Sequence, residues 1–171
     1  QQRYGLTDPL FRPGMRRPTL QEIANSLGGM TRERIRQIEE EGIRNLRSRL
    51  CRELTAPFER EWVARIEQRG GVITSTELAE FAGDPRLGGY QPWGLLVLLS
   101  EVSESIHLHF DYFATLTPKA LGILESAAVE ILREAAAPVP FATIQQRLAP
   151  LAADPNRQLT RLLTVMVDFP R

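Results

Sequence analysis

Cysteine and long apolar runs are both scarce in this chain of 171 residues. The single cysteine, Cys51, has no partner for an internal disulfide, a CxxC redox pair or a zinc knuckle, and a lone thiol favours a reducing cytoplasm. The longest apolar run, "WGLLVLL", is far too short to span a bilayer. The opening "QQRYGL" lacks the charged-then-apolar pattern of a signal peptide. We therefore expect a cytoplasmic protein that makes no membrane contact.

Motifs of common catalytic sites are also missing. The sequence has no P-loop, no nucleophile elbow, and no carboxylate spacing typical of a glycosidase or nuclease. The nearest approach to a metal site is "IHLHFD", where His107, His109 and Asp111 fall on one side of an extended strand. Because no fourth ligand is evident, we interpret these residues as a polar strand face and expect no metal site. Because the catalytic motifs are missing, we also expect no enzyme activity and no cofactor. The opposite side of that strand is expected to turn inward: Ile106, Leu108 and Phe110.

Charge is balanced overall but unevenly distributed. The formal net charge is zero, with 21 basic and 21 acidic residues. Residues 1–55 hold 11 arginines against seven acids, which leaves ten basic and 14 acidic residues in 56–171. Because nucleic-acid affinity comes mostly from Lys and Arg, only the N-terminal part is a candidate for binding phosphates. The remainder favours a scaffold or contacts with other protein subunits.

Two short helices are predicted close to the N-terminus. Thr19 and Glu22 have the spacing of a capping box, and Gly28 and Gly29 end the helix that follows. Thr31 then caps a second, amphipathic helix. Its apolar stripe is Ile35, Ile38, Ile43, Leu46 and Leu50, and its opposite face is Glu33, Arg36, Gln37, Glu40 and Arg44. This order of helix, tight turn and helix predicts a helix-turn-helix.

The middle of the chain has the order of a winged helix. "LTAPFEREW" predicts a helix with Pro57 in its first turn, and Thr74 with Glu77 forms a second capping box. "PWGLLVLLSEV" predicts a third helix, and "SIHLHFDYFATL" predicts a hairpin that turns near Asp111. The expected core comprises Trp62, Phe81, Trp93 and residues 95–99.

A third part begins at Thr117, which caps a helix with Pro118 at its first position. The rest loosely repeats the middle part and stops at "DFPR", where the first copy would start its wing, so we expect a fragment of a longer protein. The fold class is predicted as mainly α: a helix-turn-helix domain (1–54) and two tandem winged-helix-like modules (55–116 and 117–171) with a short β-hairpin. The inward face of the first helix in the third part is Leu121, Leu124, Ala128, Ile131 and Leu132.

The stretch "PTLQEIANSLGGMTRERIRQIEEEGIRNLRSRL" resembles region 4 of the sigma-70 family of bacterial transcription factors, the helix-turn-helix that reads the −35 promoter element. The resemblance extends over about residues 1–52, and "TRERIRQIE" is very close to the family's recognition helix. Two features of this sequence differ from the usual pattern of the family. Gly28, Gly29 and Met30 make the turn one residue longer, and "TDPLFRPGMRRP" is a longer connection that adds three arginines. The resemblance implies DNA and RNA polymerase as partners.

Base-reading chemistry fits this helix, since arginine pairs with guanine, glutamate accepts from cytosine and glutamine pairs with adenine. By the resemblance, Arg32, Glu33, Arg36 and Gln37 are candidates for base contacts, and Thr31, Arg34, Arg44 and Arg47 for phosphate contacts. Arg49 and Arg52 would extend the phosphate track.

Two interpretations of function remain open. The first is a sequence-specific reader of double-stranded DNA that acts in transcription. The second is a protein-interaction module of a larger protein that keeps the helix-turn-helix fold without reading DNA. A helix rich in Arg and Glu is also compatible with a plain, salt-bridged surface.

Overall fold

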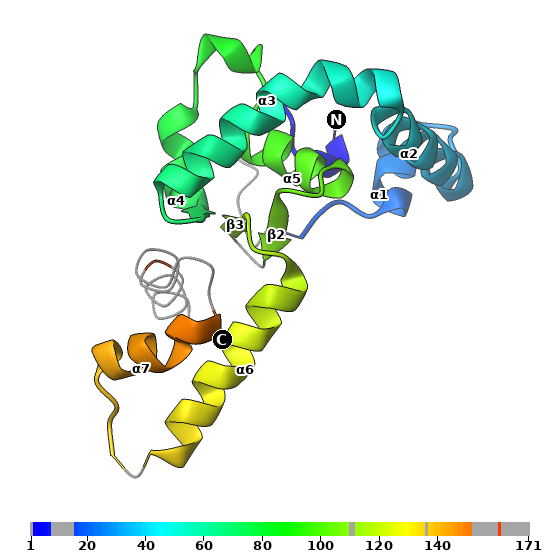
Figure 1. Ribbon diagram of the computed structural model, residues 1–171. Coiled ribbons are helices and arrows are strands. Elements are labelled where there is room, and N and C mark those ends of the chain that lie inside the picture. Colours follow the sequence, from blue (N-terminus) through cyan, green and yellow to red (C-terminus); the bar gives the residue numbers. More distant parts are fainter. Residues whose placement is uncertain (1, 8–15, 110–111, 136, 152–160, 162–171) are drawn as a thin grey trace.

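A computed structural model describes residues 2–7, 16–109, 112–135, 137–151 and 161 (Figure 1). Helices dominate, and one small antiparallel sheet lies between them, so the predicted mainly α fold class is confirmed. The helices are η1 (Gln2–Tyr4), α1 (Leu20–Ser26), α2 (Arg32–Leu46), α3 (Arg49–Gln68), α4 (Ser75–Leu78), η2 (Ala79–Phe81), η3 (Pro85–Leu87), α5 (Pro92–Val102), α6 (Pro118–Glu134), α7 (Phe141–Leu148) and η4 (Ala149–Leu151). The strands are β1 (Val72–Thr74), β2 (His107–His109) and β3 (Tyr112–Ala114).

The helix-turn-helix consists of α1 and α2. The backbone N–H of Thr19 donates to the Glu22 carboxylate over 2.6 Å, and the Glu22 N–H donates back to the Thr19 hydroxyl over 3.2 Å, which confirms the capping box. Gly28 and Gly29 both have positive φ and form the turn. The Thr31 hydroxyl then accepts from the Arg34 N–H over 3.1 Å and starts α2. A small core of Ile23, Ala24 and Ile35 holds the two helices together.

A break after α2 separates it from α3. Ser48 caps α3 with a hydrogen bond from the Cys51 N–H over 3.4 Å, so a new helix axis starts there. Leu50 therefore lies on α3, 66% exposed, and the prediction that it continues the apolar stripe is wrong. The prediction of Pro57 in a first turn is wrong as well. Pro57 lies inside α3, because the Ser48 cap starts that helix well before the proline.

The middle part has the element order expected for a winged-helix-like module. After α3 come β1, α4, α5, β2 and β3, and the sheet order is β1-β3-β2 with antiparallel pairing throughout. The predicted capping box of Thr74 and Glu77, the helix α5 and the hairpin are confirmed. The hairpin turn near Asp111 lies outside the described residues. Strand β1 was not predicted, because a strand of three residues whose last residue is the helix cap Thr74 is too short to show an alternating pattern.

The main core lies between α3, α5 and one face of the sheet. Trp62 is 1% exposed, and the Trp93 and Phe113 rings are 4.7 Å apart between centroids. Phe81 is only partly buried and packs edge-on against Trp62. The predicted core is thus confirmed, and it also takes in Tyr4 from η1.

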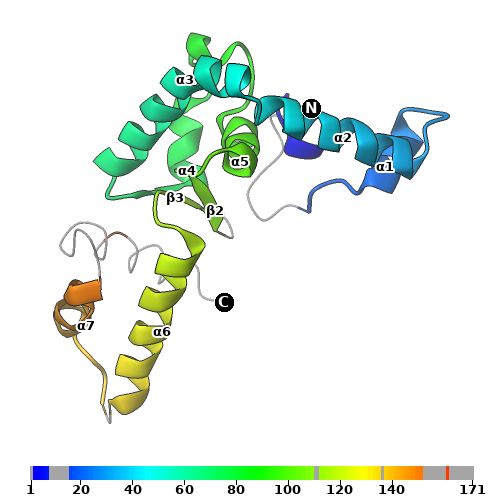
Figure 2. The same cartoon turned by 45° about the vertical axis from the view of Figure 1, so that its right-hand side comes forward.

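Both faces of the sheet are covered. Ile73 and Phe113 belong to the main core, whereas Val72, Tyr112 and Ala114 belong to a second core with α6 and α7. Figures 1 and 2 show α6 and α7 on the side of the sheet opposite α3 and α5. The strand before the turn is consequently not an open polar face. His109 is only 8% exposed, and its Nε2 lies 3.2 Å from the Leu116 carbonyl oxygen, so the polar-face interpretation is wrong at this residue.

The third part begins as predicted, with Thr117 capping α6 and Pro118 at its first position. Four of the five residues expected to face inward are buried, but Leu132 is 52% exposed and that prediction is wrong, since α7 covers only one side of α6. Residues 137–140 contain no strand, so within the described residues α7 follows α6 without a counterpart of β1. The boundaries of the three domains stay a prediction.

Candidate nucleic-acid interface

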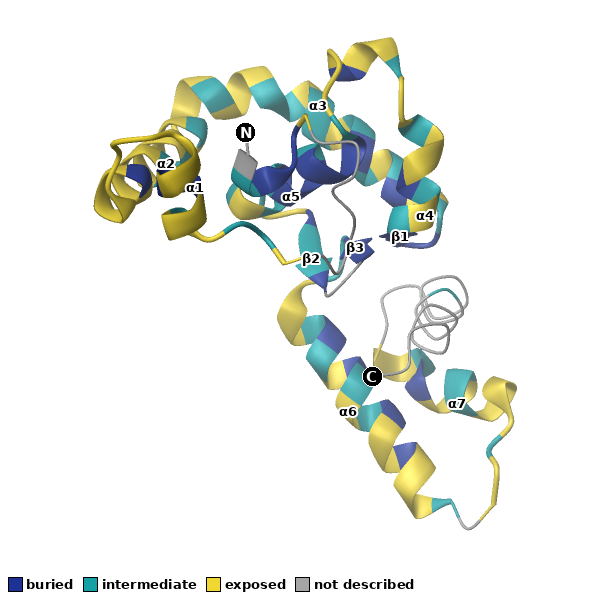
Figure 3. Cartoon of the chain, turned by 180° about the vertical axis from the view of Figure 1, so that it is seen from behind, coloured by how far each residue is buried: buried dark blue, intermediate teal, exposed yellow. Residues whose placement is uncertain are grey.

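Helix α2 presents an open, polar face to solvent. Ile35 is its one buried residue within the described chain, and the exposed colouring of α2 in Figure 3 contrasts with the buried colouring of α5. All four candidates for base contacts are exposed and lie in the first two turns of α2: Arg32, Glu33, Arg36 and Gln37. The Thr31 cap fixes where these turns begin, so the four side chains project from one end of a rigid helix.

Arg36 lies at the centre of a hydrogen-bonded cluster on this face. Its Nε is 3.0 and 3.2 Å from the two carboxylate oxygens of Glu33, and its Nη2 is 2.6 Å from one of them. Its Nη1 pairs with Glu40, one turn farther along. The hydrogen bond from Arg36 lowers the pKa of Glu33 below its usual value, and the two carboxylates raise the pKa of Arg36. Both groups are therefore fully charged at neutral pH.

The three other arginines of α2 are less constrained. The Nη1 of Arg34 donates to the Gln37 Oε1 over 3.4 Å, which is long for a hydrogen bond. Arg32 and Arg44 have no ion pair or hydrogen bond with the part of the chain that the structure describes, and both are exposed. These free guanidinium groups can reach a ligand without breaking an internal contact.

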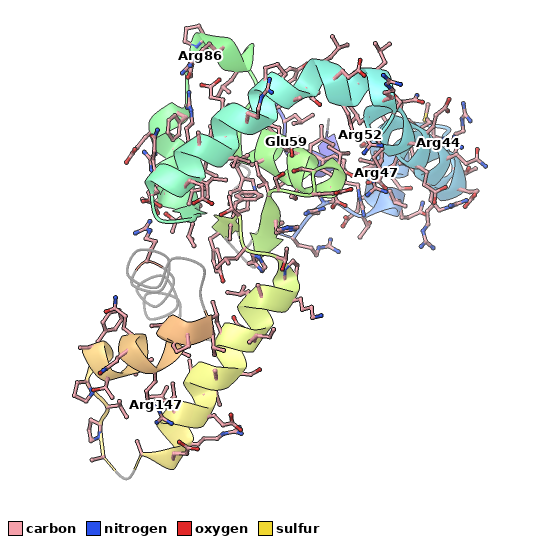
Figure 4. The ribbon with its side chains drawn as sticks, viewed as in Figure 1. Arg44, Arg47, Arg52, Glu59, Arg86 and Arg147 are labelled. Atoms are coloured by element: carbon pink, nitrogen blue, oxygen red, sulfur yellow. The ribbon has the colours of Figure 1, made fainter. Side chains whose placement is uncertain are left out.

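Arg47 is engaged within the protein. It donates to the carbonyl oxygen of Glu101 through Nη2 over 2.5 Å and through Nε over 3.2 Å. Glu101 lies in the last turn of α5, where helix carbonyls lack partners and a cation is favoured. Figure 4 shows Arg44, Arg47 and Arg52 close together where α2 meets α3. Arg49 pairs with Glu53 over 2.9 Å, and Arg52 donates to the Arg47 carbonyl over 2.9 Å.

Segment η1 and helix α5 attach the helix-turn-helix to the middle part. The Gln91 N–H donates to the Leu6 carbonyl over 2.7 Å, and the Tyr4 hydroxyl donates to Glu39 of α2 over 3.1 Å. Burial, followed by the nearby Glu39 carboxylate, raises the pKa of Tyr4 to about 12. A Cβ on Gly94 would lie 2.6 Å from the Tyr4 carbonyl oxygen, so only glycine permits this approach. No sequence pattern marked η1 and α5 as partners.

An apolar groove of about 490 Å³ lies beside the candidate reading face. Leu27, Met30 and Ile38 on its walls are 43–49% exposed. The walls come from η1, α1, α2 and α5, and the paired side chains of Arg3 and Glu39 also line it. The groove is a second feature of the helix-turn-helix that is open to a partner.

In the middle part, α5 and the hairpin strands offer no polar face comparable to that of α2. Helix α5 occupies the position that follows α4 and precedes the hairpin, yet its one ionisable residue is Glu101. Six of its 11 residues are buried: Pro92, Trp93, Gly94, Leu96, Val97 and Leu99. The described residues of the hairpin strands include no lysine or arginine. Helix α5 and the described hairpin strands are therefore poorly suited to bind phosphates.

The histidine pair on β2 does not form a metal centre with its described neighbours. The His107 and His109 rings are 6.4 Å apart between centroids. Burial lowers the pKa of His109, and Asp111 lies outside the described residues. Across the described ranges, no group of three or more potential ligand side chains converges. Over the same residues, every helix is too short or too polar to cross a membrane.

Comparison with known proteins points to one segment. A comparison with curated proteins found no match, and neither did a comparison with solved structures. A family model described as "Sigma-70, region 4" matches residues 2–48, which include η1, α1 and α2. This is a family of DNA-binding helix-turn-helix domains of transcription, not of catalytic domains. Residues 2–48 are therefore a sigma-70 region 4 helix-turn-helix.

Proposed function

We propose that this protein binds double-stranded DNA sequence-specifically and reads a −35-like promoter element by placing α2 in the major groove. The observation that carries the proposal is the exposure of Arg32, Glu33, Arg36 and Gln37 on the capped first two turns of the region 4 helix. An α-helix fits the major groove, where each base pair presents a distinct set of donors and acceptors. Recognition helices of this class contact bases with their N-terminal residues.

Each side chain has a proposed role. Arg32 and Arg36 donate to guanine O6 and N7, Glu33 accepts from cytosine N4, and Gln37 pairs with adenine. Thr31, Arg34 and Arg44 contact phosphates, which positions the helix without reading sequence. The free side chains of Arg32 and Arg44 support this assignment. For Arg47 we propose a phosphate contact only if DNA displaces the Glu101 carbonyl, because that carbonyl takes two of its donors in the free protein.

The test is fluorescence anisotropy with a duplex carrying a TTGACA-like element and a scrambled duplex, titrated at several salt concentrations. Specific binding exceeds non-specific binding by about a thousandfold or more in typical readers, and phosphate contacts make log K fall linearly with log salt. We expect the triple substitution Arg32→Ala, Glu33→Ala, Gln37→Ala to abolish the preference. The matched control changes the same residue types on exposed positions of α6 and α7: Glu130→Ala, Arg133→Ala, Gln146→Ala. A control variant that loses selectivity equally would contradict the proposal.

A protein-binding role is the second candidate, and the apolar groove favours it. We propose RNA polymerase as the partner, which the sigma-70 resemblance implies, with residues 55–171 available to other subunits. The substitution Ile38→Glu places a charge in the groove and should weaken polymerase binding while the base-contact residues stay intact. If purified polymerase binds the wild type and the base-contact triple variant equally, but duplexes bind neither, the protein-binding role alone remains.

A further inference from the structure

Glu40 lies on the same face of α2 as the proposed base contacts, but it has no role among them. At 3.6 residues per turn, Glu33 and Glu40 fall within roughly 20° of each other around the helix, with Arg36 between them. The Glu40 side chain is 61% exposed, and its carboxylate pairs with the Arg36 Nη1. With Glu33 on Nε and Nη2, a carboxylate contacts each of the three guanidinium nitrogens of Arg36 in the free protein.

We propose that Glu40 is a specificity-determining residue of the DNA interface, where it disfavours phosphate contacts by Arg36 more than base contacts. This inference rests on the proposed function. A phosphate that approaches Arg36 brings a negative charge close to Glu40, and two like charges about 4 Å apart repel. The guanine edge presents the neutral acceptors O6 and N7, so it meets the same guanidinium without that repulsion.

The consequence concerns non-specific binding. Non-specific affinity comes almost wholly from phosphate contacts, whereas selective affinity adds base contacts. A carboxylate at the centre of the reading face therefore weakens the non-specific mode more than the specific one. Glu40 acts through Arg36 and is a positioning residue, not a base reader.

Glu41 provides a matched control on the neighbouring position. It is exposed, and it forms no ion pair with the described part of the chain. Around the helix it lies about 100° from Glu40, so its charge is not directed at Arg36. Glu40→Gln and Glu41→Gln change the net charge equally, and both keep a helix-compatible side chain of the same size.

The experiment measures the affinity of wild type, Glu40→Gln and Glu41→Gln for the element duplex and the scrambled duplex across salt. Exposed ion pairs have modest energies, so we expect Glu40→Gln to tighten scrambled binding about two- to fivefold and element binding less than twofold. Its salt slope on the scrambled duplex should steepen by about one, because Arg36 joins the phosphate contacts. Glu41→Gln should tighten both duplexes alike. In an Arg36→Ala background, the extra effect of Glu40→Gln should disappear.

Each other outcome overturns the inference. Equal changes in the two single variants, with a selective wild type, leave the DNA-reading function standing and remove the role of Glu40. A selective loss of element binding in Glu40→Gln would make Glu40 a direct base contact instead. A wild type that does not distinguish the duplexes removes both the inference and the proposed function.

Discussion

Helices α2 and α5 each follow a shorter helix within their own part of the molecule, yet their surfaces are opposite. Eight of the 15 residues of α2 are charged and one of its described residues is buried. In α5, one of 11 residues is charged and six are buried. Figure 3 shows this contrast along the two ribbons. A helix in a suitable topological position is thus not sufficient for reading DNA, because its surface must also be free and polar.

The contrast assigns different tasks to the two helices. We propose that α2 reads DNA, and α5 fixes the helix-turn-helix to the rest of the chain through η1, Gly94 and the Arg47 contact. The orientation of α2 relative to the middle part is therefore set by its contacts with η1, α3 and α5.

The largest effect is expected from filling the contact between α5 and η1. Gly94→Ala places a methyl group 2.6 Å from the Tyr4 carbonyl oxygen and 2.8 Å from Gly5, which is backbone that cannot rotate away. Overpacking of this kind costs roughly 1–3 kcal/mol of unfolding free energy, measurable by urea denaturation. The control is Gly122→Ala in α6, where a Cβ meets nothing within 4 Å and alanine should be neutral or stabilise by up to about 1 kcal/mol. Equal results for the two variants would contradict the docking role of α5.

A smaller effect separates Arg47 from Arg44. Arg47→Ala removes two hydrogen bonds to the α5 terminus and should lower the unfolding free energy by about 0.5–1.5 kcal/mol. Arg44→Ala should leave stability within about 0.5 kcal/mol but reduce the salt slope of DNA binding by about one. Urea denaturation and anisotropy on the same two proteins check this. An unchanged stability in Arg47→Ala, with a reduced salt slope, would place Arg47 among the phosphate contacts.

The unfolding free energy should depend on pH through His109, which lies on the covered side of the sheet. Burial lowers the pKa of His109 below its usual value of about 6.5, so the unfolded chain takes up a proton at mildly acidic pH before the folded chain does. The unfolding free energy should therefore fall as pH decreases below about 6.5. We expect this decrease to be smaller than the decrease caused by Gly94→Ala. A series of urea denaturations from pH 7.5 to 5 measures it. In His109→Gln this part of the pH dependence should be absent, and an identical slope in both proteins would exclude His109 as its source.

The smallest effect concerns the open side of α3. Leu50 and Leu54 are 66% and 72% exposed, so they contribute little to the core. Leu50→Gln should change the unfolding free energy by no more than about 0.5 kcal/mol. A loss of 2 kcal/mol or more in thermal or urea denaturation would mean that the apolar stripe of α2 does continue through Leu50.

Local signals were predictable from the sequence. Both capping boxes, the Thr31 and Thr117 caps and the two-glycine turn depend on residues close in sequence, and all are confirmed. The exposed face of α2 followed from the helical period alone. The base-contact and phosphate-contact residues stay predictions, although their exposure agrees with them.

Non-local features were not predictable. The burial of His109 depends on α6 covering the sheet, and the engagement of Arg47 depends on the α5 terminus, more than 50 residues away. The docking of η1 on α5 depends on backbone approach at Gly94, which no periodicity reveals. Leu132 and Leu50 carry the right spacing for a core but are exposed, because none of the described helices and strands lies over them.

The most direct test of the division between α2 and α5 is an NMR titration of the labelled protein with the TTGACA-like duplex. Backbone amide and arginine Nε–H resonances would be followed in both helices. We predict large shifts in residues 31–37 and 44, with the amides of 93–99 nearly unchanged. Shifts centred on α5 and the β2–β3 hairpin, with α2 unaffected, would contradict the assignment of DNA reading to α2.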